Sequence, residues 1–244
     1  MAQGEIGFTM KTEKLDLETN GGRTSAFVAL PAGTETGTSA DAASTTTAAA
    51  VILIHEWWGI NDHIRDIAGR YASEGFVCVA PDLYRGKTAR DTQEASRLMQ
   101  ELATEDGLDI IRRAIAETRR AYGVSKVGIT GYCMGGTFAL RAACEIETLG
   151  AAAPFYGDIP EEEKLAQLSV PTLFIAAKLD NWITPSKVKG LEDAARKHNL
   201  PVEAVSYDAD HAFFNDTRPE VHDPVAAQDA WARVLKLFGE NLHQ

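Results

Sequence analysis

A cysteine lies at the apex of a glycine-flanked turn in the segment 127–140, VGITGYCMGGTFAL. The residues before the turn read as an apolar strand and those after it as a helix. Gly131 and Gly135 would let the flanks approach closely while Cys133 takes a strained backbone conformation. Such a turn lifts a side chain clear of a sheet, and the dipole of the following helix favours a thiolate over a thiol. The segment predicts a nucleophilic cysteine. The alternative is a buried cysteine in a glycine-rich corner.

Two further residue types that nucleophilic catalysis needs follow later strands. Asp180 follows one apolar strand-like run, and His211 follows the next. A histidine can take the proton of the nucleophile, and a carboxylate can hold the imidazole in the required tautomer. The order nucleophile, acid, histidine along the chain is that of α/β-hydrolases. Asp208 and Asp210 compete for the acid role, but they share the histidine's own loop and rank second.

A glutamate ends another apolar strand in the segment VILIHEWWGIND. Burying a carboxylate without a partner is costly. We therefore expect Glu56 either to be partly solvated or to face Cys133 and His211 and affect which form the sulfur takes. Hydrolases of this order place the second backbone N–H of the oxyanion hole in this loop. His55 suggests a metal ligand, but the second histidine of H-E-x-x-H is missing, so no zinc is expected.

Strand-like and helix-like runs alternate from residue 51 onward. Continuous apolar runs predict buried strands, and apolar residues at helical spacing predict helices. The predicted strands are 51–54, 76–81, 126–130, 151–156, 171–177 and 202–207, and the predicted helices are 62–74, 91–103, 105–122, 134–146, 186–198 and 224–241. This succession predicts an α/β fold with a mostly parallel sheet, helices on both faces and an active site at the carboxyl ends of the strands.

The N-terminal part has a different pattern. Two strand-like runs, 13–19 and 24–30, flank the turn sequence NGGR and predict an antiparallel hairpin. The Ala/Thr-rich stretch 32–50 has no periodicity, and we expect a flexible insertion there. Nothing in the middle of the chain resembles an interdomain hinge, so residues 1–244 are predicted to form a single domain.

The charge balance excludes some partners. The 244 residues include 24 Lys and Arg against 35 Asp and Glu, which gives a net charge of −11. This field repels nucleic acid and acidic membrane surfaces, so neither is an expected partner. The 3 cysteines fit a reducing compartment better than a disulfide framework. No apolar run is long enough for a membrane span, so we expect a cytoplasmic protein.

Five segments carry a resemblance to a known family: HEWWGIND, APDLYRG, GYCMGG, KLDNWITP and DADHAFF. They resemble the dienelactone hydrolases, also called carboxymethylenebutenolidases, from about residue 14 to about residue 240. The resemblance implies an α/β-hydrolase fold in a monomer without cofactor, which opens a lactone by attack of Cys133. It implies an oxyanion hole from the N–H groups of Trp57 and Met134. It also implies that Glu56 contacts the resting thiol and takes its proton when the substrate's carboxylate arrives.

The resemblance is weaker at the residues that bind substrate. The family has an arginine after PDLY that binds a substrate carboxylate, and here Arg85 follows Tyr84 directly, one residue earlier than in well-known members. We expect Arg85 to face the same rim as the nucleophile. A second family arginine, four residues after the histidine, is Asn215 here, and Arg218 is the nearest candidate. Tyr84 and Trp58 are also expected to contact substrate.

Three functions remain open from the sequence. The first is hydrolysis of a dienelactone, the second is a broader carboxylesterase activity, and the third is non-catalytic binding of small molecules or partners by a hydrolase fold. A complete set of nucleophile, acid and base argues against the third function. The expected partner is therefore a small-molecule lactone or ester.

Overall fold

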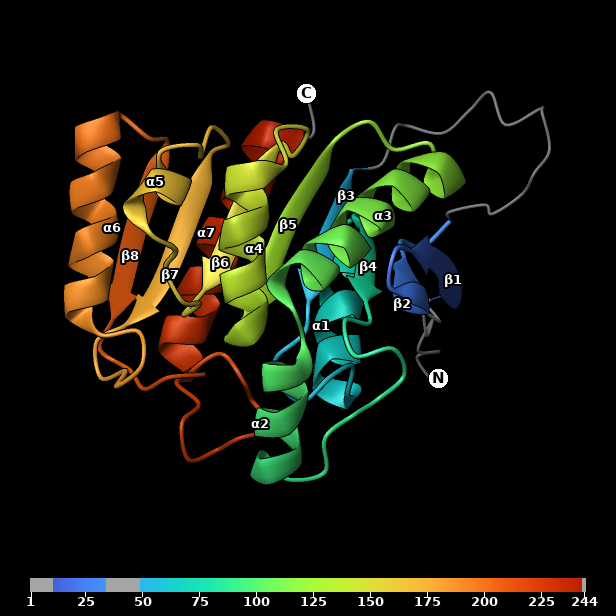
Figure 1. Cartoon of the computed structure of the whole chain (residues 1–244), viewed down its shortest axis with the longest axis horizontal. Helices are drawn as coiled ribbons and strands as arrows, with labels where there is room; N and C mark the ends of the chain where they lie inside the picture. The colour runs from blue at the N-terminus through green and yellow to red at the C-terminus, as the bar shows by residue number, and fades with distance from the viewer. Residues whose placement is uncertain (1–10, 34–48, 243–244) are drawn as a thin grey trace, which may run out of the picture.

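One sheet of eight strands forms the centre of the described part of the chain, residues 11–33 and 49–242 of the computed structural model (Figure 1). The strand order is β1-β2-β4-β3-β5-β6-β7-β8. β1 pairs antiparallel with β2, and β2 pairs antiparallel with β4. All other neighbours pair in parallel. The predicted mostly parallel sheet and N-terminal hairpin are confirmed.

The elements follow the predicted alternation closely. The strands are β1 Lys11–Thr19, β2 Gly22–Leu30, β3 Ala50–Ile54, β4 Val77–Pro81, β5 Val127–Tyr132, β6 Ala151–Phe155, β7 Thr172–Ala177 and β8 Val202–Tyr207. The helices are α1 Asp62–Ser73, α2 Thr92–Glu101, α3 Thr104–Tyr122, α4 Met134–Glu145, α5 Glu162–Leu165, α6 Pro185–His198 and α7 Pro224–Leu242.

Helices cover both faces of the sheet (Figure 1). Successive side chains of a strand point to opposite faces, and in β3 all of them are buried. Ile52 and Ile54 pack in the cluster that contains residues of α3, α4 and α6, whereas Val51 and Leu53 pack in the cluster that contains residues of α1 and α7. Burial on both faces explains why the parallel strands read as continuous apolar runs.

The parallel strands end at one edge of the sheet. The loops after β3, β5, β7 and β8 carry Glu56, Cys133, Asp180 and His211. The sheet topology therefore brings together four side chains that are far apart in the sequence.

Two details differ from the sequence prediction. α5 has only 4 residues, too few to give a helical period, and it was not predicted. The predicted insertion 32–50 is wrong at its C-terminal end, because Ala49 and Ala50 are buried and Ala50 begins β3. Residues 34–48 of that insertion lie outside the described residues. The prediction that all of 1–244 is one domain stays a prediction.

Among the described residues, no helix has the length and apolar character needed to cross a membrane.

Candidate active site

Cys133 occupies a strained turn between β5 and α4. Its φ is 57° and its ψ is −117°, in the region that non-glycine residues avoid. A Cβ atom on Gly135 would lie 2.2 Å from the carbonyl oxygen of Ile54, and one on Gly131 would lie 2.3 Å from the carbonyl oxygen of Gly135. Backbone atoms cannot move aside for such a contact, so both positions require glycine. The predicted turn geometry is present.

His211 is oriented by Asp180. Its Nδ1 lies 2.6 Å from Oδ2 of Asp180, while its buried Nε2 has no hydrogen-bond partner within the described residues. Burial alone would raise the pKa of Asp180, but the hydrogen bond with His211 and the backbone N–H groups of Ile183 and Trp182 together lower it. A charged carboxylate on Nδ1 fixes the tautomer that leaves Nε2 able to accept a proton.

Both residues border a cavity of about 320 Å³. The cavity is lined by Glu56, Trp57, Trp58, Cys133, Leu179, Asp180, Asn181, Trp182, Asp210, His211, Ala212, Arg218 and Val221. Cys133 is 8% exposed. The nucleophile, acid and histidine predicted from the sequence therefore share one pocket with Glu56, large enough for a small organic molecule.

The resting sulfur is a thiol. Burial, together with the neighbouring carboxylate of Glu56, raises the pKa of Cys133 to about 12, against the smaller opposing effects of a hydrogen bond with the Met134 N–H and the charge of Arg218. The N–H at the start of α4 lowers the pKa of the thiol in the expected direction, but it does not decide the resting state. Burial and a like charge outweigh one helix terminus, so a nucleophilic role of Cys133 would require a base to remove the proton.

Glu56 is buried, with a hydrogen-bond donor beside it. It is 2% exposed, and its Oε2 accepts a hydrogen bond of 2.9 Å from Nδ2 of Asn215. Burial raises its pKa to about 7, against the opposing effects of the Asn215 hydrogen bond and the charges of His211 and Arg218. Near neutral pH this carboxyl group can therefore gain or lose a proton, and a solvated carboxylate does not describe it.

The two residues predicted to supply the N–H groups of an oxyanion hole, Trp57 and Met134, both lie close to the site. Trp57 lines the cavity, and the Met134 N–H is hydrogen-bonded to Cys133.

His55 fixes the loop that carries Trp57. The Leu83 N–H donates to His55 Nε2 at 3.2 Å, so Nδ1 carries the proton and donates to the Glu56 carbonyl oxygen at 2.6 Å.

His55 is thus a structural link between the loops after β3 and β4. Burial lowers its pKa, and the ring is neutral. Within residues 11–33 and 49–242 there is no cluster of three or more His, Cys, Asp or Glu side chains that could hold a metal ion. Both observations favour a structural role of His55 over metal binding.

Arg85 is turned away from the cavity. Its Nη1 donates to the carbonyl oxygen of Gly22 in the hairpin at 3.0 Å, and its Nη2 lies 2.5 Å from Oδ1 of Asp106 on α3. The expectation that Arg85 faces the rim of the nucleophile is wrong, because the hairpin and α3 supply its acceptors. Tyr84 is buried as well, with its hydroxyl 3.1 Å from Sδ of Met134, and it does not line the cavity, contrary to the expectation that it contacts substrate.

Arg218 supplies the positive charge of the cavity instead. Among the lining side chains of the described residues, it is the only arginine or lysine. Its Nε donates to Glu220 at 2.8 Å, and its side chain is 37% exposed. Arg218 can therefore turn toward a ligand at the expense of one exposed ion pair.

Aromatic rings form one side of the cavity. The ring centroids of Trp57 and Trp58 are 5.1 Å apart, those of Trp57 and Trp182 are 5.9 Å apart, and Trp182 lies 5.5 Å from His211. Trp58 was predicted to contact substrate and lines the cavity. Trp182 was not predicted, although its position in the loop of Asp180 could have suggested it.

Tyr156 and Asn215 were also not predicted as site residues. Tyr156 is buried, has a φ of 37°, and packs against His211 at 5.0 Å between ring centroids. Neither residue belongs to a pattern that signals chemistry, and only the fold places them against the site.

Comparison with known proteins decides the family. The model of the Dienelactone hydrolase family matches residues 37–242. The chain belongs to this family. A relative from Aquifex pyrophilus, "Protein usf", is 36% identical over 78% of this chain and 87% of its own length. A "Putative carboxymethylenebutenolidase" from Aquifex aeolicus is 34% identical over 77% of this chain and 86% of its own length.

A solved structure supports the same assignment. The crystal structure of a "Putative Dienelactone Hydrolase" from Klebsiella pneumoniae superposes with a TM-score of 0.83 at 26% sequence identity, covering 95% of this chain and 99% of that one. This member of the dienelactone hydrolase family thus has the α/β-hydrolase fold expected from its sequence. Family membership indicates a hydrolase that acts on a lactone or ester.

Proposed function

We propose that this member of the dienelactone hydrolase family cleaves small lactones or esters with Cys133 as its nucleophile. The observation that supports this most is the arrangement of His211. Its Nδ1 is hydrogen-bonded to Asp180, and its Nε2 is without a hydrogen-bond partner among the described residues. His211 lines the same cavity as the thiol of Cys133. That is the arrangement a general base needs.

The first half of the reaction forms a thioester. Nε2 of His211 takes the proton of the Cys133 thiol while Sγ attacks the carbonyl carbon, and the carbonyl electrons move to its oxygen. The N–H groups of Trp57 and Met134 bind that oxyanion. As it collapses, the ester C–O bond breaks, and the leaving oxygen takes the proton from His211. In a lactone, the leaving group stays attached to the acyl chain.

The second half regenerates the thiol. A water molecule gives a proton to His211 and attacks the thioester carbonyl, so that the product leaves as a carboxylic acid and the sulfur regains the proton. Glu56 is a second base for the first step. With a pKa of about 7 beside a thiol with a pKa of about 12, it takes the proton only when the substrate changes the local charge.

Two substrate classes fit the cavity. A dienelactone carries a carboxylate, and Arg218 is the side chain that would bind it, while the names of the relatives favour this class. Two observations favour a broader carboxylesterase activity. Arg85 is held by the hairpin and so is not available to bind a substrate carboxylate. The tryptophan side chains of the cavity suit an uncharged apolar group. We place dienelactones first. The cytoplasmic location and the monomeric state stay predictions.

Steady-state kinetics on matched lactones and esters, with and without a free carboxylate, test this proposal. Cys133→Ala should abolish turnover of every compound. Arg218→Ala should lower kcat/KM for carboxylate-bearing substrates by roughly ten- to a hundredfold, the value of a charge-assisted hydrogen bond, and leave neutral esters nearly unchanged. Arg85→Ala is the matched control and should affect neither class selectively. Equal losses for Arg218→Ala on both classes would favour the general esterase, and no turnover by the unmodified protein would favour non-catalytic binding.

A further inference from the structure

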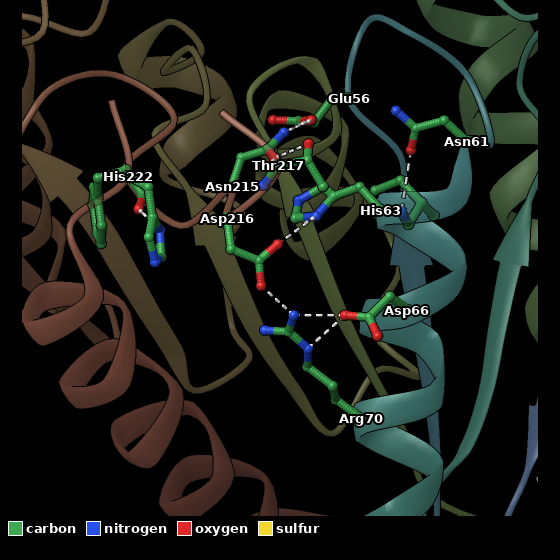
Figure 2. Close-up of polar contacts among 11 residues, drawn as sticks. Glu56, Asn61, His63, Asp66, Arg70, Asn215, Asp216, Thr217 and His222 are labelled. Atoms are coloured by element: carbon green, nitrogen blue, oxygen red, sulfur yellow. Dashed lines mark hydrogen bonds and ion pairs between the residues drawn. The ribbon is translucent and has the colours of Figure 1, made fainter. Parts of the chain in front are cut away.

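The orientation of the Asn215 amide is fixed by its neighbour. Oδ1 of Asn215 accepts hydrogen bonds from the Thr217 N–H at 3.1 Å and from the Thr217 hydroxyl at 2.6 Å (Figure 2). A backbone N–H can only donate, so this side of the amide is the oxygen. The NH₂ group consequently faces Glu56, with Nδ2 and Oε2 separated by 2.9 Å.

Asp216, which lies between Asn215 and Thr217 in the sequence, is anchored to α1. Asp216 is paired through Oδ2 with Arg70 of α1, and Nε of Arg70 also donates to Oδ2 of Asp66 at 2.7 Å (Figure 2). His63, Asp66 and Arg70 are spaced three and four residues apart, so they lie on one face of the helix. The loop that carries Asn215 is therefore attached to α1 by the side chain of Asp216.

The buried ring of His63 also contacts the carboxylate of Asp216. It is 3% exposed, and its Nδ1 lies 3.4 Å from Oδ1 of Asp216. Burial lowers the pKa of His63, and the charge of Arg70 opposes its protonation as well. The ring is neutral at physiological pH, so the charged partner of Asp216 is Arg70.

α1 is in turn fixed close to Glu56. Asn61 caps its N-terminus and accepts a hydrogen bond of 3.1 Å from the Ile64 N–H. The segment from Glu56 to Asn61 is short and includes Gly59, where a Cβ atom would lie 2.8 Å from the carbonyl oxygen of Lys87. Glu56 and Arg70 thus belong to one fixed unit, and Asp216 ties the loop of Asn215 to that unit.

We propose that Asp216, held by Arg70, is a positioning residue that keeps the Asn215 amide against Glu56 and so controls when this carboxyl group holds a proton. The proposal rests on the proposed function for the catalytic meaning of Glu56. The contact itself does not depend on that function.

Charges near Glu56 allow a test by sign. The groups that act on it or respond to it are Cys133, Tyr156, His211, Asn215 and Arg218. The pKa of Glu56 is set by burial, the Asn215 hydrogen bond and the charges of His211 and Arg218, without a direct contribution from Asp216. Removing its negative charge would lower the pKa of Glu56 if it acted directly, whereas loss of the Asn215 hydrogen bond would raise it.

The experiment measures the carboxyl group without turnover. The ¹³Cδ shift of Glu56 is titrated by NMR in protein labelled at glutamate, and the signal is assigned by its absence in Glu56→Gln. Asn215→Leu removes the donor and should raise the pKa of Glu56 by about 1 to 2. Asp216→Asn should raise it in the same direction by about 0.5 or more. The double variant should match Asn215→Leu, because Asp216 acts only through that amide.

A matched control separates positioning from stability. Glu145 pairs with Arg112 of α3 at 2.7 Å, away from the cavity. Glu145→Gln should lower the thermal midpoint and leave the titration of Glu56 unchanged. Should Asp216→Asn fail to fold, Arg70→Lys, which keeps the charge but loses the guanidinium fork, should give a smaller rise.

An unchanged or lowered pKa of Glu56 in Asp216→Asn, or an additive double variant, would overturn the proposal. Because the titration needs no substrate, these results are independent of the nucleophile. Activity retained in Cys133→Ala would instead overturn the proposed function and leave the positioning result standing.

Discussion

At the scale of single residues, three protonation states decide what the cavity can do. Asp180 is charged and orients His211, Cys133 is a thiol, and Glu56 titrates near neutral pH. His211 has a free Nε2 and shares its cavity with a thiol of high pKa, so attack by the sulfur would need a base, because almost no thiolate is present at rest. The reaction rate should therefore depend on the orientation of His211.

The first prediction concerns that orientation. Asp180→Asn should lower kcat by about 10⁴-fold, since an amide no longer holds the tautomer that leaves Nε2 free. Asp208→Asn and Asp210→Asn keep the contact of 2.6 Å between His211 and Asp180 and should be much milder. Steady-state kinetics on one activated ester measure all three variants. A larger loss in Asp208→Asn or Asp210→Asn would show that the acid has been misassigned.

Which site residues could be predicted depends on how each one acts. Cys133, Asp180 and His211 are recognisable because each follows a strand in a fixed order. Asn215 contributes through contacts that only the folded loops create, whereas Trp182 could have been inferred from its position in the loop of Asp180. The sequence also did not predict where the side chain of Arg85 points, because its hydrogen-bond acceptors come from the hairpin and α3, which are distant in sequence.

At the scale of secondary structure, the turn between β5 and α4 depends on close approach of two backbones. Gly135 lies against the end of β3, where a Cβ atom would meet the carbonyl oxygens of Ile54 at 2.2 Å and His55 at 2.7 Å. This approach lets the helix start directly beside the loop of Glu56. The elements themselves were predictable from their apolar periods, apart from the short α5 and the start of β3.

The second prediction tests that approach. Gly135→Ala should lower the free energy of unfolding by about 2 kcal/mol or more, because α4 or β3 must shift. Gly190→Ala is the matched control. Gly190 is helical like Gly135, but it is exposed, and a Cβ atom there meets nothing within 4 Å. It should be neutral or stabilising by up to about 1 kcal/mol. Chemical denaturation measures both, and equal stability of the two variants would contradict the close-approach account.

At the scale of the whole molecule, the site reduces stability in a pH-dependent way. Burial raises the pKa of Glu56 from an ordinary 4.5 to about 7. Between these values the folded protein holds a proton that the unfolded chain has lost, so stability falls as pH rises through this window. The net charge of −11 acts in the same direction at high pH, because the compact chain repels itself more strongly.

The third prediction isolates the contribution of Glu56. Relative to the unmodified protein, Glu56→Gln should gain about 3 kcal/mol of stability between pH 4.5 and pH 8, since glutamine cannot ionise. Urea denaturation at several pH values measures the difference. Glu74→Gln, at an exposed position, should show no such trend. A constant difference between Glu56→Gln and the unmodified protein would mean that Glu56 is ionised throughout this range.

The most direct test of the account is to find the acyl group during turnover. The enzyme is mixed with an activated ester, quenched with acid before the steady state, and cleaved after Lys126 and Arg141 to release the peptide 127–141, in which Cys133 is the single cysteine. Mass spectrometry should find the acyl group as a thioester on this peptide and not on the peptides of Cys78 or Cys144. An acyl group on any other residue, or continued turnover by Cys133→Ala, would contradict the account.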